Sequence, residues 1–307
     1  MADSDGLAVP IDFRANYGAG NRRALVLGGG GIFFIAWQVS YLRELHRRGV
    51  DLGRATAVVG TSAGSVVAAL LAGDRIGLAS KELAVMARLP SVVAAMAPAD
   101  DLSASQNRAL EMFRNARDAE PQTIRDIGYA ALAAQSLPAS KLRRSVGSLV
   151  AQRSWPAPAL QITCVDAYTG ERLVIKGSHG IPISRAAAAS SSVPGLFSPQ
   201  PVLDRKCMDG GVSGSGTHTD LVVGAERVVI MSLSAESTRT EPMLTIQPDC
   251  LQREAEAVRA AGGQVFLRGP HETDIDTLMS PSAVPDAVAM GAEQAAADAD
   301  ALTAFWN

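Results

Sequence analysis

Hydrophobic positions in the first quarter of the chain alternate between short apolar runs and amphipathic segments. Residues 24–27 form an apolar run that ends in four glycines, and residues 35–48 then carry apolar side chains at helical spacing. A second apolar run at 57–59 precedes a second helical segment at 65–72. This alternation predicts an α/β fold in three layers, with a mostly parallel central sheet and helices on both faces.

The remaining pattern predicts a helical middle and a second set of strands. Residues 74–150 are expected to be mostly helical, interrupted by prolines. Tyr168-Thr169-Gly170 predicts a hairpin turn between two of the later strands. Strands are expected at 160–166, 171–175, near 202–203, at 227–232 and at 265–267, and helices at 184–192, 251–261 and 283–305.

Two stretches bear on the domain organisation. Residues 1–21 are polar and without periodicity, so we expect a flexible N-terminal lead-in followed by one domain over 22–307. The uncharged stretch at 55–73 is long enough to span a bilayer. Its internal glycines, serines and threonines would interrupt a membrane helix, and they favour a strand, a turn and a helix instead.

Composition narrows the function classes. The chain is 47% hydrophobic with a net charge of −3, which supports a large core and argues against a nucleic-acid partner. Cys164, Cys207 and Cys250 are widely separated, so neither a disulfide framework nor a thiolate metal site is indicated. The N-terminus lacks the pattern of a secretory signal. We therefore expect a cytoplasmic protein that needs no cofactor and no metal.

The strongest catalytic motif is Gly-Thr-Ser-Ala-Gly at 60–64, which fits the G-x-S-x-G pattern of a nucleophile elbow. A serine on a sharp strand-to-helix turn passes very close to its neighbours, so Gly60 and Gly64 leave the room that the turn needs. The following helix directs its positive end at the serine oxygen. Ser62 is therefore the candidate nucleophile, and a turn without chemistry is the alternative.

Two further glycine motifs follow predicted strands. Residues 28–31 are four glycines whose N–H groups can converge on an anion, as an oxyanion hole or a phosphate cradle, although the dinucleotide fingerprint and the Walker lysine are absent. Asp209, followed by Gly210 and Gly211, supplies a carboxylate after a strand. A Ser–Asp–His order would pair Ser62 and Asp209 with His218 or His271, and the residues alone leave this triad open.

Four segments resemble the patatin-like phospholipases in order and spacing. They are LGGGGIFFIAWQVSYL from residue 27, GTSAGS from residue 60, ASSSVPGLFSP from residue 189 and MDGGVSGSGTHTDL from residue 208. The resemblance covers about residues 24–229 and extends more weakly to the C-terminus.

The resemblance implies a patatin-like fold and a Ser–Asp dyad without histidine. Carried over to this chain, it makes Ser62 the nucleophile, Asp209 the base, and Gly29, Gly30 and Gly31 the oxyanion loop. The implied activity is that of a serine lipid-acyl hydrolase, a phospholipase or esterase acting on a lipid or another acyl ester. Because residues 32–37 carry no charge, we expect an apolar mouth to the site and at most peripheral contact with membranes. An acyltransferase with the same acyl-enzyme and a non-catalytic lipid-binding protein are the alternatives.

The chain departs from the family at the end of the glycine loop. The family usually reads G-G-G-x-R/K-G, whereas residues 29–34 here read Gly-Gly-Gly-Ile-Phe-Phe. A bulky residue at positive φ is an outlier, so we expect Phe34 to keep an ordinary φ while Gly30 and Gly31 absorb the turn. The rings of Phe33 and Phe34 then either narrow the acyl pocket or pack under the helix.

Overall fold

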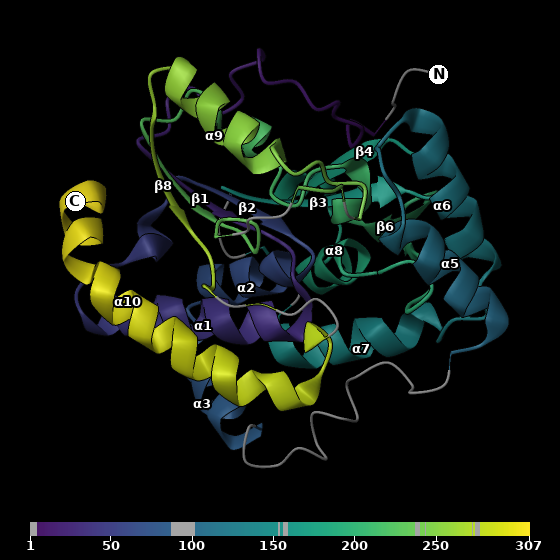
Figure 1. Cartoon of the computed structure of the whole chain (residues 1–307), viewed down its shortest axis with the longest axis horizontal. Coiled ribbons are helices and arrows are strands. Elements are labelled where there is room, and N and C mark those ends of the chain that lie inside the picture. Colours follow the sequence, from purple (N-terminus) through teal and green to yellow (C-terminus); the bar gives the residue numbers. More distant parts are fainter. Residues whose placement is uncertain are drawn as a thin grey trace.

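The computed structural model describes residues 5–86, 102–152, 154–155, 159–236, 240–242, 244–271, 273 and 277–307. Part of the predicted helical middle, residues 87–101, lies outside the described residues. Within the described part, a central sheet is flanked by helices (Figure 1). The fold is the α/β arrangement that the sequence predicts.

The sheet has eight strands, of which five run parallel. The parallel strands are β3 (Leu160–Asp166), β2 (Ala57–Thr61), β1 (Arg23–Leu27), β7 (Arg227–Met231) and β8 (Gln264–Arg268), in that spatial order. β4 (Arg172–Lys176) and β6 (Arg205–Asp209) pair antiparallel with β3, and β5 (Gln200–Val202) pairs with β6. The hairpin predicted at Tyr168-Thr169-Gly170 joins β3 to β4.

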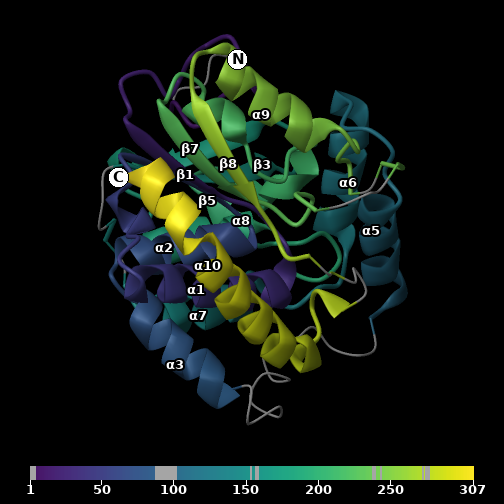
Figure 2. The same ribbon diagram turned by 60° about the vertical axis from the view of Figure 1, so that its left-hand side comes forward.

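Helices cover both faces of this sheet (Figures 1 and 2). The larger group contains α1, α2, α7, α8 and α10 with α3 beside them, while α9 covers the opposite face, and α5 and α6 lie at the β6 end. The bounds are α1 Gly31–Arg47, α2 Ala63–Ala72, α3 Ile76–Met86, α5 Ala104–Arg114, α6 Pro121–Ala133, α7 Ala139–Val150, α8 Ile183–Ser190, α9 Cys250–Ala260 and α10 Val284–Trp306.

Strand side chains alternate between two hydrophobic clusters, as the pleat requires. In β1, Leu25 and Leu27 pack in the larger cluster with α1 and α10, whereas Ala24 and Val26 pack with α9 on the other face. Both sets are fully buried. This is why β1 reads as an uninterrupted apolar run and not as an alternating one.

The pairing of β3 brings two strand ends together. β4 occupies one edge of β3 over residues 161–165, so β2 and β6 must share the other edge. β2 ends opposite Thr163 and β6, running the other way, ends with Asp209 opposite Cys164. The carboxyl ends of β2 and β6 therefore meet end to end, and the residues that follow them face each other.

Residues 7–9 of the N-terminal segment lie against β4. The Val174 N–H donates to the Leu7 carbonyl at 2.9 Å, the Val9 N–H donates to the Arg172 carbonyl at 3.1 Å, and Leu7 is fully buried. The division of the chain at residue 21 stays a prediction. None of the helices in the described segments is both long and apolar enough to cross a bilayer, and residues 55–73 divide into β2 and α2.

Candidate active site

Ser62 lies at the turn between β2 and α2, where it is the N-cap of the helix. Its backbone has φ 52° and ψ −122°, a conformation that non-glycine residues adopt only at a cost of about 1–3 kcal/mol. The residue is 9% exposed. Because the N-terminus of α2 carries a partial positive charge, negative charge at the serine oxygen is stabilised there.

The two flanking glycines are required by close packing. A Cβ at Gly64 would overlap the carbonyl oxygen of Leu27, and one at Gly60 would lie 2.7 Å from the Ser65 Cα. Both clashes involve backbone atoms, which cannot move without disturbing β1 or α2. The glycine requirement inferred from the spacing therefore has a steric cause.

The glycine loop runs directly past Ser62. A Cβ on Gly29 would lie 3.0 Å from the Ser62 Cβ. The Gly29 N–H donates to the Gly216 carbonyl at 3.1 Å and is thus already engaged, whereas those of Gly30 and Gly31 have no acceptor among the described residues. Within the described part of the chain, the N–H groups of Gly30 and Gly31 are therefore not engaged, unlike that of Gly29, the third predicted oxyanion residue.

The phenylalanines that depart from the family pattern lie in the core. α1 begins at Gly31, four residues before the predicted start of the helix, and Gly31 has φ 66°. Phe34 therefore lies inside α1 and has an ordinary φ. The Phe34 ring is fully buried and stacks on Trp37 at 5.4 Å. Phe33 is 5% exposed. Both rings pack under the helix, as one of the two alternatives predicts.

Asp209 ends β6 and is 4% exposed. Its Oδ1 accepts the Gly211 N–H at 2.9 Å, and a Cβ at Gly210 would lie 2.8 Å from the Thr163 carbonyl oxygen. Burial raises the pKa of Asp209 to about 6, and hydrogen bonding from the Ser62 hydroxyl and the Gly211 N–H opposes this rise. The second carboxyl oxygen, Oδ2, is buried and has no hydrogen-bond partner among the described residues.

Three consecutive serines at the end of α8 connect the two sides of the site. The Ser190 hydroxyl accepts the Ser62 N–H at 2.8 Å, and the Ser191 hydroxyl donates to the Ser62 carbonyl at 3.2 Å. The Ser192 carbonyl accepts the Asp209 N–H at 3.0 Å. The sequence motif contained these serines, but their role depends on contacts with distant segments.

His218 lies behind the Asp209 loop. Its Nε2 donates to the Gly210 carbonyl at 3.1 Å, and the Arg172 guanidinium donates to its Nδ1 at 3.2 Å. Burial, followed by the Arg172 charge, lowers the pKa of His218 to about 3, so the ring stays neutral. None of its hydrogen bonds among the described residues reaches Ser62 or Asp209, and His271, the other triad candidate, is exposed.

A buried carboxylate on α9 holds the loop that receives the Gly29 N–H. Glu254 is 2% exposed and accepts the Ser215 hydroxyl at 2.6 Å and the Thr217 hydroxyl. Gly216, between these two residues, supplies the carbonyl for Gly29. A lone Glu in an amphipathic helix gave no sequence signal for this role.

In the described part of the chain, no group of three or more acidic, His or Cys residues is arranged to hold a metal.

A serine at a strained strand–helix turn, a glycine loop beside it and a buried carboxylate opposite are typical of α/β proteins that transfer acyl groups. The model of the patatin-like phospholipase family matches residues 25–221. The chain belongs to this family, whose members are hydrolases that act on lipid esters.

Solved structures also resemble the chain. The type III effector protein ExoU shares 17% sequence identity with this chain, and the TM-score of the two structures is 0.32. The match covers 95% of this chain and 56% of the ExoU chain. VipD from Legionella pneumophila shares 14% sequence identity with this chain, with a TM-score of 0.43. That match covers 98% of this chain and 69% of the VipD chain. The chain thus spans little more than half the length of ExoU. No curated protein matches it.

Proposed function

We propose that this protein is a serine lipid-acyl hydrolase that cleaves acyl esters through a covalent intermediate on Ser62, with Asp209 as the base. The observation that carries the proposal is the meeting of β2 and β6 at the edge of β3, which sets Ser62 opposite a buried carboxyl. A raised pKa makes that carboxyl a stronger base than an ordinary aspartate.

In the first half of the reaction, Asp209 takes the proton of the Ser62 hydroxyl as its oxygen attacks the ester carbonyl carbon. Negative charge then develops on the carbonyl oxygen. The N–H groups of Gly30 and Gly31, which have no acceptor among the described residues, and the N-terminus of α2 are donors that can stabilise it. Collapse of this intermediate breaks the ester bond, and Asp209 returns the proton to the departing alcohol.

In the second half, water attacks the acyl-enzyme and Asp209 again accepts a proton. The acid leaves, and the Ser62 hydroxyl regains its proton from Asp209. One carboxyl can perform both steps because its pKa of about 6 lies near neutrality, so both protonation states are accessible.

A fluorophosphonate probe and four variants test this mechanism. The probe should label the wild-type protein at Ser62, and Ser62→Ala should abolish labelling. Ser62→Ala and Asp209→Asn should each lower the kcat for a simple ester at least about a thousandfold, and the double variant should be no slower than either. The exposed Asp126→Asn on α6 is the matched control.

A folded protein that neither reacts with the probe nor hydrolyses any ester would reject the proposal and favour the non-catalytic alternative. Activity that survives Asp209→Asn would reject Asp209 as the base. Product that forms only when an alcohol or amine acceptor is added would identify an acyltransferase instead.

A further inference from the structure

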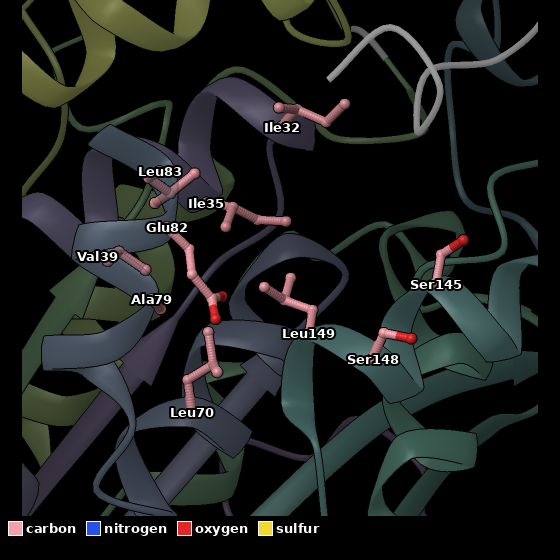
Figure 3. A pocket seen from close by; sticks show the side chains of 10 residues that line it. All are labelled: Ile32, Ile35, Val39, Leu70, Ala79, Glu82, Leu83, Ser145, Ser148 and Leu149. Atoms are coloured by element: carbon pink, nitrogen blue, oxygen red, sulfur yellow. The ribbon is translucent and has the colours of Figure 1, made fainter. Parts of the chain in front are cut away.

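An apolar groove of about 370 Å³ lies between α1, α2, α3 and α7 (Figure 3). α1 supplies Ile32, Ile35 and Val39 to its lining, and α2 and α7 supply Leu70 and Leu149. A volume of this size is within the range of pockets that bind small organic molecules, about 300–1,000 Å³.

One end of the groove adjoins the glycine loop. Ile32 directly follows Gly31, the left-handed residue with the free N–H at the start of α1. A substrate carbonyl oxygen that accepts the Gly31 N–H would therefore lie next to the residue at which the lining of the groove begins. From there the groove continues along α1 past Ile35 to Val39 (Figure 3).

The groove contains a single acidic side chain among its described lining residues. Glu82 extends from α3 into the space near Ala79, Leu70 and Leu149 (Figure 3). The residue is exposed, so its carboxylate is hydrated where the groove opens to solvent. An apolar chain that reaches Glu82 would have to strip water from this charge, which is unfavourable.

We propose that this groove binds the acyl chain of the substrate ester and that Glu82 limits the length of chain it accepts. The inference rests on the proposed acyl-hydrolase function and specifies its substrate. Methylenes between Ile32 and Glu82 gain apolar contacts, each favouring binding about fourfold. Methylenes beyond Glu82 gain nothing, so the enzyme prefers chains that end before this carboxylate.

The first test measures kcat/KM for one leaving group esterified to acetyl, butyryl, hexanoyl, octanoyl, decanoyl, lauroyl and palmitoyl chains. For the wild-type protein kcat/KM should rise with chain length and then fall. Glu82→Leu should move the maximum to longer chains and raise the ratio of palmitate to butyrate by about tenfold or more, close to the effect of two buried methylenes. Glu82→Gln should shift the maximum of kcat/KM in the same direction, but by a smaller amount.

Two controls isolate the groove. Glu111→Gln removes an exposed carboxylate from α5 and should leave the chain-length profile unchanged. Ser145→Phe fills the groove from α7, so it should lower kcat/KM for octanoate while sparing acetate. Ser140→Phe makes the same substitution on the same helix outside the lining and should spare both.

Calorimetric titration of decanoate into Ser62→Ala measures occupancy of the groove without turnover. Binding should disappear when Ser145→Phe is added and persist with Ser140→Phe. If the protein hydrolyses esters but Glu82→Leu and Ser145→Phe leave its chain-length profile unchanged, this inference is overturned and the proposed function stands. Decanoate binding at the groove in a protein that the fluorophosphonate does not label would reject the proposed function and retain the groove as a fatty-acid site.

Discussion

Asp209, the proposed base, also affects the stability of the fold, because its carboxyl is buried and its pKa is raised to about 6. A base must be deprotonated to act. We therefore expect kcat/KM for an uncharged ester to rise with pH, to reach half its maximum near pH 6 and to stay level above that, in a profile measured with a pH-independent leaving group. A profile that is flat down to about pH 4 would contradict this.

The same shift predicts a gain in stability on removing the charge. The folded state keeps the Asp209 proton up to about pH 6, whereas the unfolded chain releases it near the ordinary value of 3.8. The folded state thus binds more protons in that window, so stability falls as pH rises through it and stays lower above it. Asp209→Asn should raise the free energy of unfolding by about 1–3 kcal/mol at neutral pH and by almost nothing near pH 4. Urea unfolding at both values of pH measures this.

Ser62 stores backbone strain that the hydroxyl does not cause. With φ 52° and ψ −122°, any residue with a Cβ is strained, and glycine is not. We expect Ser62→Gly to be more stable than Ser62→Ala by about 1 kcal/mol, although both lack the proposed nucleophile. Thermal unfolding of the two inactive variants checks this directly, and equal or reversed stabilities would show that the turn is unstrained.

At the scale of elements, α9 supports the glycine loop from the opposite face of the sheet. Glu254 accepts the Ser215 and Thr217 hydroxyls, and Gly216 between them accepts the Gly29 N–H. The positions of Gly30 and Gly31 therefore depend on a helix that packs against the other face of the sheet.

Glu254→Ala should displace this support and lower kcat about tenfold or more, with a smaller change in KM, because in the proposed mechanism the affected donors act on developing charge. Glu254→Gln keeps an acceptor oxygen and should retain more activity than Glu254→Ala. Glu256→Gln, an exposed carboxylate on the same helix, is the control. A fall in thermal stability without any change in kcat would show that Glu254 serves the fold alone.

At the scale of the whole molecule, one buried ion pair joins three distant parts of the chain. Arg172 of β4 binds Asp220 through two contacts at 2.6 and 2.8 Å, and both side chains are almost fully buried. The Arg172 guanidinium also donates to the carbonyls of Val9 and Pro10 and to His218. The N-terminal segment, the sheet and the loop behind Asp209 are thus connected.

Asp220→Ala should lower the free energy of unfolding by about 3–5 kcal/mol, because it leaves the Arg172 charge buried and unpaired. Glu44→Ala removes two ion pairs of α1 with exposed arginines and should cost less than about 1 kcal/mol. Urea denaturation of both variants measures the difference. If both variants lose a similar amount of unfolding free energy, the buried ion pair contributes no more to stability than the exposed ones.

The sequence by itself determined most of the local elements and the candidate residues, although it predicted one strand near 202–203 where the structure has β5 and β6. Apolar runs such as 24–27 and helical spacing such as 251–261 gave strands and helices whose ends lie within a few residues of those observed, because burial on a sheet imposes these periods. The motif spacing selected Ser62, Asp209 and the glycine loop, since tight turns accept few residues. The start of α1 was predicted late, because glycines disfavour helices except where the fold requires them.

Only the tertiary structure decided what those residues meet. Strand pairing at the edge of β3 set Asp209 opposite Ser62, although 147 positions separate them (209 − 62). Burial in that place raised the pKa of Asp209, and contacts across the fold gave Ser190, Glu254 and His218 their positions behind the site. Periodicity records how each segment faces the core, whereas burial and hydrogen bonding depend on which segments pack together, and a single sequence does not encode that locally.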